Sequence, residues 1–189
     1  MIAIGGWSDG SIKYSQMAKN KDSRKEFVNS VLEFLETHNF DGLDLSWYAI
    51  NLICVLLIDF HRYFPGFLDH GQKGGNLEDK QNFVLLIQEL HDAFHLKGYV
   101  LSASVSSKKD FIDISYDITA LSKHLDFINL MTYDFHGYRE SETGPTAPLY
   151  LKPSATGTDL EYTVEYAVNY WINKEADPKK IVIINISNF

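Results

Sequence analysis

The fold class is decided by the stretch Phe40-Asp41-Gly42-Leu43-Asp44-Leu45-Ser46-Trp47. It reads as a short apolar strand with polar side chains gathered where the apolar run ends. Similar apolar runs recur along the chain, and segments with helical spacing separate them, as parallel strands covered by helices require. We therefore expect an α/β fold whose parallel strands follow one another in sequential order, near residues 1–5, 40–46, 99–105, 127–133 and 181–186.

Three of the intervening segments show apolar residues at helical spacing. The predicted apolar faces consist of Phe27, Val31, Phe34 and Leu35, then of Phe83, Leu86, Ile87 and Leu90, and finally of Tyr162, Tyr166, Ala167 and Tyr170. Asp22 and Asp79 are placed to favour the starts of the first two helices, and Gly98 suits the end of the second.

Two α/β architectures fit this alternation, the open doubly wound sheet and the closed (β/α)8 barrel. Both place their chemistry at the carboxyl ends of successive strands. The first strand is followed by Gly5-Gly6 rather than by a Gly-x-Gly-x-x-Gly motif, so we set nucleotide binding aside. A closed barrel usually needs about 250 residues. With 189 residues, the chain is too short to close one.

Composition excludes several classes of partner. The 17 basic and 25 acidic residues give a formal net charge of −8, which argues against nucleic acid and anionic membranes because both require clustered Lys and Arg. Cys54 is the single cysteine, so no internal disulfide and no cysteine metal cluster is expected, and we expect neither metal nor cofactor. Met1 leads directly into an apolar run, so no signal peptide is expected in this sequence.

Three segments together resemble glycoside hydrolase family 18, the chitinases and chitinase-like lectins. Residues 40–47 resemble the fourth-strand signature Asp-x-x-Asp-x-Asp-x-Glu, and Ala3-Ile4-Gly5-Gly6-Trp7 is similar to the third strand. Asn129-Leu130-Met131-Thr132-Tyr133-Asp134-Phe135-His136-Gly137 resembles the sixth-strand motif, and residues 143–144 and 147–150 continue the likeness. The resemblance implies a partial (β/α)8 TIM barrel that covers strands three to seven, with residues 1–189 as one partial catalytic-type domain.

The resemblance also implies a chemistry. In this family the N-acetyl oxygen of the substrate acts as the nucleophile. The final Glu of the signature protonates the glycosidic oxygen, and the Asp two residues before it orients the acetamido group. By family likeness Met131, Tyr133 and Asp134 contact the sugar and Trp7 stacks on another ring. The implied partner is chitin or an N-acetylglucosamine oligosaccharide, and the implied location is extracellular.

The sequence departs from the family at the catalytic positions. Asp41 and Asp44 match the first two acids, but Ser46 stands in place of the third Asp and Tyr48 in place of the Glu. Serine carries no charge near pH 7, and tyrosine, with an ordinary pKa of about 10, is a poor acid for this task. We therefore expect Asp41 and Asp44 to be remnants of the acidic motif and the chain to be catalytically silent.

Each of these residues also has a plain structural interpretation. Asp41 suits a turn before a strand, and Trp7 suits a core position. Met131 taken alone would be a core side chain. Asp44 is harder to explain in this way, because a carboxylate flanked by Leu43 and Leu45 on a strand needs a partner or a function.

An apolar insertion separates Trp47 from Phe64-Pro65-Gly66, which resembles what normally follows the catalytic Glu. Its sixteen residues, 48–63, include twelve apolar ones. Either an intron has been read as coding sequence, or a genuine insertion packs outside the barrel layer. A membrane-spanning helix is disfavoured, because it would need about 20 apolar residues. Three functions stay open: a silent chitin-binding protein, a chitinase in a truncated or mis-spliced form, and a fragment whose exposed sheet edges leave it without stable function.

Overall fold

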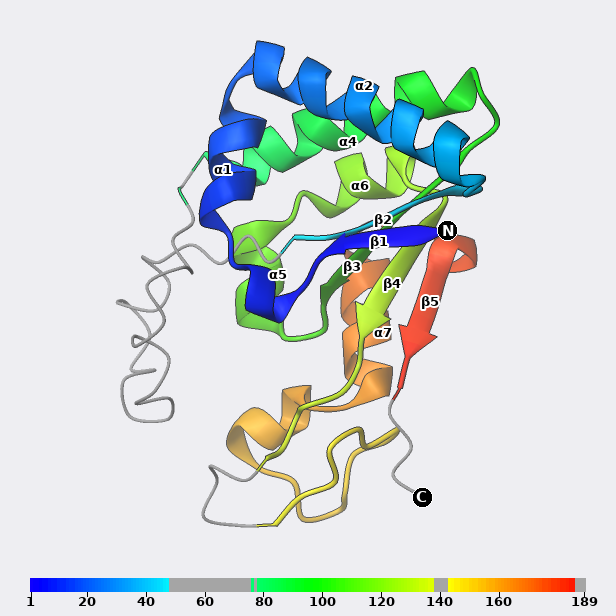
Figure 1. The fold of residues 1–189 in the computed structure, drawn as a ribbon. Coiled ribbons are helices and arrows are strands. Elements are labelled where there is room, and N and C mark those ends of the chain that lie inside the picture. Colours follow the sequence, from blue (N-terminus) through cyan, green and yellow to red (C-terminus); the bar gives the residue numbers. More distant parts are fainter. Residues whose placement is uncertain (48–75, 77, 138–142, 186–189) are drawn as a thin grey trace.

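The computed structural model of the chain describes residues 1–47, 76, 78–137 and 143–185, with the exception of the Trp7 side chain. Within these residues one parallel sheet has the order β1-β2-β3-β4-β5, which is the order of the chain (Figure 1). All four neighbouring pairs are parallel, so the predicted arrangement is confirmed and the doubly wound alternative is wrong. The strands are β1 (Ile2–Gly5), β2 (Gly42–Ser46), β3 (Val100–Ser106), β4 (Phe127–Met131) and β5 (Ile181–Ile184).

Helices connect the consecutive strands, as the right-handed crossovers of a parallel sheet require. Figure 1 shows α2, α4 and α6 stacked on one side of the strands. The α-helices of the described residues are α1 (Ile12–Lys19), α2 (Lys21–His38), α4 (Asp79–His95), α5 (Lys109–Ser115), α6 (Ile118–His124) and α7 (Val164–Asn173), and the short 3-10 helices are η1 (Trp7–Asp9), η3 (Gly157–Glu161) and η4 (Pro178–Lys180).

The two faces of the sheet differ in character. One face joins the helices in the main apolar core, to which the strands contribute Leu43, Leu45, Leu101, Ala103, Val105, Ile128 and Leu130. The other face carries Asp44, Ser102, Ser104 and Asn129, which bond to one another. The side chains of these strands therefore alternate between an apolar face against the helices and a polar inner face. A barrel accounts for this, because its helices cover the outer face only and its inner face can hold polar side chains.

The predicted helical faces are correct for α4 and only in part for the other two helices. All four residues predicted for the face of α4 are buried. On α2, Val31 and Leu35 are buried but Phe34 is 46% exposed, where its ring lies parallel to that of Phe40. The third helix begins after Tyr162, and its buried side chains are Val164, Ala167 and Trp171.

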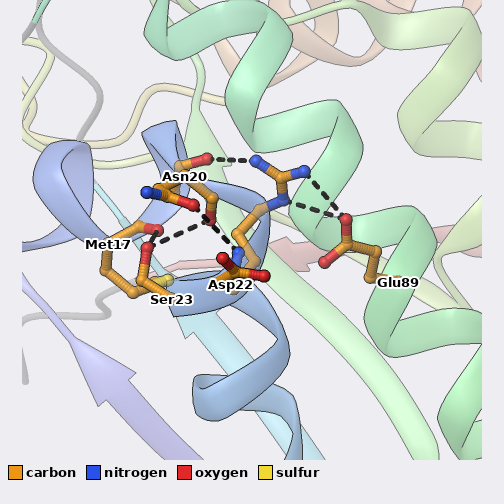
Figure 2. A network of polar contacts seen from close by, with 7 residues as sticks. Met17, Asn20, Asp22, Ser23 and Glu89 are labelled. Atoms are coloured by element: carbon orange, nitrogen blue, oxygen red, sulfur yellow. Dashed lines mark hydrogen bonds and ion pairs between the residues drawn. The ribbon is translucent and has the colours of Figure 1, made fainter.

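A buried arginine ties the start of α2 to α4. Arg24 is 5% exposed, and its Nε and Nη2 donate to Glu89 Oε1 at 3.0 and 2.9 Å, while its Nη1 donates to the carbonyl of Ala18 at 2.7 Å. The same corner holds the cap of α2, in which the Asn20 side chain accepts the Asp22 backbone N–H at 3.0 Å (Figure 2). Because the guanidinium is paired on both sides, the charge of Arg24 is compatible with its burial.

Trp47 closes β2 on the core side of the sheet. Its indole Nε1 donates to Ser11 Oγ at 2.8 Å, and its ring meets that of Phe83 edge-on at 5.5 Å. Residues 48–63, the predicted insertion, lie outside the described residues. In the part of the chain that the structure describes, no helix has the length and apolar character needed to cross a membrane.

Candidate functional site

Asp44 is the centre of a polar network on the inner face of the sheet. Its Oδ1 accepts from Ser102 Oγ at 2.6 Å and from Asn129 Nδ2 at 2.8 Å, and its Oδ2 accepts from Ser104 Oγ at 2.8 Å. The half-buried carboxylate of Asp44 is thus oriented by three donors, two from β3 and one from β4. Hydrogen bonds to a charged acceptor are stronger than those between neutral groups, so this carboxylate is held in a defined direction.

The strand register explains why these residues meet. Asp44 is paired with Ser102, and Ser104 is paired with Asn129. Because side chains alternate along a strand, residues 102 and 104 share the face that Asp44 occupies. The sequence reasoning noted polar residues at this strand end but missed the two serines and Asn129 as partners of Asp44. The available signal was the two-residue spacing of the serines within an apolar run.

The motif position after Asp44 also lies on this inner face. Ser46 is half-buried at the carboxyl end of β2, two residues beyond Asp44. Its carbonyl accepts the backbone N–H of Gly6 at 2.8 Å, which ties the end of β1 to the end of β2. Tyr48, the other departure from the family motif, lies outside the described residues.

Asp41 is separate from the network. It is exposed and precedes β2, at the amino end of the strand. Its carbonyl accepts the backbone N–H of Val100 at 2.9 Å, so its backbone contributes to the pairing of β2 with β3. The structure therefore brings Asp44 and Ser46 to one face of the strand and leaves Asp41 at the other end of it.

The end of β4 holds the predicted sugar-contacting residues. Met131 is buried and in register with Ser106 and Ile184, and its carbonyl accepts from Ser107 Oγ at 2.6 Å. Thr132 follows and is fully buried, with its Oγ1 donating to the carbonyl of Ile184 at 2.8 Å. These bonds hold the end of β4 against both of its neighbouring strands.

Tyr133 and Asp134 continue from this anchored strand end. Burial raises the pKa of the half-buried Tyr133 hydroxyl, and the neighbouring Asp134 carboxylate raises it further, so the hydroxyl stays a neutral donor at neutral pH. Asp134 is exposed and has a φ of 55°, a left-handed conformation that Asp and Asn tolerate better than most residues. The chain therefore turns sharply at Asp134, one of the residues predicted to contact the sugar.

Trp7 lies in a tight turn at the end of β1. Gly5 and Gly6 have φ values of 103° and 104°, and a Cβ on Gly5 would lie 2.3 Å from the carbonyl oxygen of Ser46. Only glycine fits such a left-handed position so close to another backbone. Trp7 then begins η1, and its side chain lies outside the described residues.

The carboxyl ends of β1, β2 and β4 thus bring Trp7, Ser46 and Tyr133 to the same end of the sheet, where parallel barrels hold their sites. Among the described residues, no group of three His, Cys, Asp or Glu side chains is arranged to hold a metal ion. The inner face and this end of the sheet offer a fixed carboxylate, hydroxyl donors and the ring of Tyr133, a set suited to a polar ligand with an apolar face.

Comparison with known proteins identifies the family. The family model described as glycosyl hydrolases family 18 matches residues 1–185 of the chain. The chain belongs to glycosyl hydrolase family 18. Because this family folds as a (β/α)8 TIM barrel, the five-stranded sheet of the family 18 chain is a partial barrel.

The relatives of this family 18 chain include enzymes and a protein described as a pseudo-chitinase. The chain is 37% identical over 183 residues to probable chitinase 10 of Drosophila melanogaster. The match covers 96% of this chain and 7% of that protein. Catalytic domain 2 of the Ostrinia furnacalis Group II chitinase superposes with a TM-score of 0.80 at 40% identity, covering 96% of this chain and 43% of that one. Human YKL-39, described as a pseudo-chitinase with retained chitooligosaccharide binding, superposes with a TM-score of 0.78 at 36% identity, covering 96% and 46%. The chain therefore spans less than half of the length of each of these relatives.

Proposed function

We propose that this chain is a chitinase-like protein that binds chitin or N-acetylglucosamine oligosaccharides without hydrolysing them. The observation that carries the proposal is the contrast within one motif. Ser46 and Tyr48 occupy the two positions that the family's reaction needs as acids, while Asp44 keeps a complete set of hydrogen-bond partners.

The chemistry explains why this contrast separates binding from turnover. The family's reaction needs a proton donor at the glycosidic oxygen and a carboxylate that orients the acetamido group. Ser46 can form hydrogen bonds but carries no charge, and a tyrosine with an ordinary pKa of about 10 gives up a proton poorly to a leaving group. Binding needs neither group, because Trp7, Met131, Tyr133 and Asp134 belong to other strand ends. YKL-39, described as a pseudo-chitinase that retains chitooligosaccharide binding, supports this separation.

A second candidate function is an active chitinase. It is favoured by Phe64-Pro65-Gly66, which resembles the continuation of the family motif after the catalytic Glu and follows sixteen apolar-rich residues. If residues 48–63 come from an intron read as coding sequence, the mature protein has a different residue after Trp47. Sequencing the transcript across codons 46 to 66 discriminates between the two functions. An extracellular location is part of both proposals, since the chitin that is bound or hydrolysed lies outside cells.

The activity test compares three proteins in a complete barrel. Residues 1–185 replace the matching segment of the Ostrinia furnacalis catalytic domain, once unchanged and once with S46D and a single Glu in place of residues 48–63. A third version carries Gln in place of that Glu. Hydrolysis of a fluorogenic chitotrioside and calorimetric binding of chitotetraose are measured for each.

We expect the unchanged segment to bind chitotetraose and to hydrolyse at the background rate of the Gln version. The repaired segment should turn over about 10²- to 10⁴-fold faster, the usual contribution of a general acid. Turnover by the unchanged segment near the repaired rate would show that it is an enzyme. Absence of binding in all three would refute the sugar-binding proposal.

A further inference from the structure

Two histidine rings meet between α4 and α6, at a distance from the candidate site in the fold, and a third lies beside them on α4. The His124 ring, in the last turn of α6, meets that of His91 on α4 at 5.2 Å between centroids and at an angle of 66°. The His91 ring in turn lies 6.1 Å from that of His95, one turn further along α4. We call His91, His95 and His124 the histidine cluster.

The His124 ring has an unusual hydrogen-bonding state. Its Nδ1 is buried and has no hydrogen-bond partner, and no other buried side-chain nitrogen or oxygen among the described residues shares this condition. A neutral imidazole can leave one nitrogen as an unused acceptor at moderate cost. A protonated imidazole would carry an N–H on this atom, with a share of the charge and no acceptor within reach. The folded geometry therefore disfavours the protonated ring.

The charges around His124 act mainly in the same direction. Burial lowers the pKa of the His124 imidazole, and the positive charge that His91, Lys123 and Lys180 bring lowers it further, while Asp92 opposes them. Lys180, which leads into β5, is held close by a hydrogen bond from its Nζ to the carbonyl of Ser122 at 2.8 Å. His91 and Asp92 lie on α4, Lys123 lies on α6 and Lys180 lies at the end of η4. All three elements thus contribute to the electrostatic potential at His124.

We propose that the histidine cluster is an acid-sensitive contact that loosens α6 from α4 as the pH falls below about 6.5. In an unfolded or detached segment the imidazole is hydrated and has its ordinary pKa. In the packed state the pKa of His124 is lower, so between the two values the opened state binds more protons. Stability contributed by this contact is thus present above the ordinary pKa and is lost as the pH falls toward the lower one.

The test uses the whole chain and compares wild type with H124F. Phenylalanine keeps a ring against His91 but cannot be protonated. H38F, which changes an exposed histidine on α2, is the matched control. Amide hydrogen exchange of α6 and the urea unfolding midpoint are measured at pH 7.5 and pH 5.5, a range above the ordinary pKa of Asp and Glu. Asp79, whose carboxyl pKa is raised by burial, is common to all the proteins, so its contribution cancels in the comparison.

We expect the protection factor of α6, the ratio of the intrinsic to the observed exchange rate at each pH, to fall on acidification in the wild type and in H38F but not in H124F. At pH 5.5 the protection lost should approach about tenfold, because this pH lies one unit below the ordinary pKa of histidine. An equal acid response in H124F would overturn the proposal. If H124F does not fold, an NMR titration of the wild-type histidine ring protons decides the question: a His124 midpoint at or above the ordinary value overturns the proposal, and a lower one supports it.

Discussion

Two acids of one motif, three residues apart, have opposite surroundings. Asp44 is half-buried and accepts three side-chain hydrogen bonds, whereas Asp41 is exposed at the amino end of the same strand. Asp41 lies before the first residue of β2, whereas Asp44 lies within the strand on its inner face, so the motif's regular appearance in sequence conceals this difference. Only Asp44 is placed to order the inner face of the sheet.

Removing the Asp44 carboxylate should therefore destabilise the chain. In D44A the donors of Ser102, Ser104 and Asn129 lose their shared acceptor, and leaving buried polar groups unpaired costs about 1–3 kcal/mol. Urea unfolding measures the free energy of unfolding directly. The matched control is D41A, whose midpoint should stay at the wild-type value; equal losses in both variants would contradict the assignment of the network to Asp44.

At the level of elements, the pairing of β2 with β3 depends on the absence of a side chain at the start of β2. Gly42 lies opposite Val100, and a Cβ at this position would lie 2.0 Å from the Val100 carbonyl oxygen and 2.8 Å from its nitrogen. Backbone atoms cannot move aside as a flexible side chain can. The glycine thus sets how closely the two strands approach, and Asp44 and Ser102 form the next-but-one pair along this ladder.

The substitution G42A should separate β2 from β3. Overpacking of this kind typically costs about 1–3 kcal/mol, and a backbone clash belongs at the upper end of that range or beyond it. Thermal unfolding followed by circular dichroism provides the measurement. G137A is the comparison, because a Cβ there meets no atom within 4 Å. A melting temperature equally affected by both variants would show that the close approach to Val100 does not limit this position.

At the level of the whole molecule, the described sheet has two outer strands, β1 and β5. On β5, Val182 and Ile183 are 41% and 49% exposed. An apolar outer strand offers unpaired backbone groups beside apolar side chains and therefore invites pairing with another chain. The 189-residue chain by itself should associate through this edge.

A lysine on the edge should oppose that association. Light scattering after size exclusion should show wild-type mass rising with concentration and V182K remaining closer to a monomer, because edge lysines block strand pairing. L96K is the matched control: Leu96 is the most exposed large apolar residue described, at 87%, but follows a helix. If L96K suppresses association as well as V182K does, general surface charge rather than the sheet edge is responsible.

The sequence by itself determined the elements and the family. Apolar runs and helical spacing are local properties, so the five strands, their order and the buried face of α4 could be predicted from them. The motifs at residues 3–7, 40–47 and 129–137 identified the family because residue type and spacing are preserved in the sequence itself. The chemical departures at Ser46 and Tyr48 were visible for the same reason.

The tertiary structure decided which side chains meet. Asp44 bonds to residues 58, 60 and 85 positions further along the chain, and the strand register selects them. Packing also left Phe34 partly in solvent, although its spacing matched the core face. The unpaired Nδ1 of His124 has no sequence signal either. Each of these depends on long-range packing, which no local pattern of residues encodes.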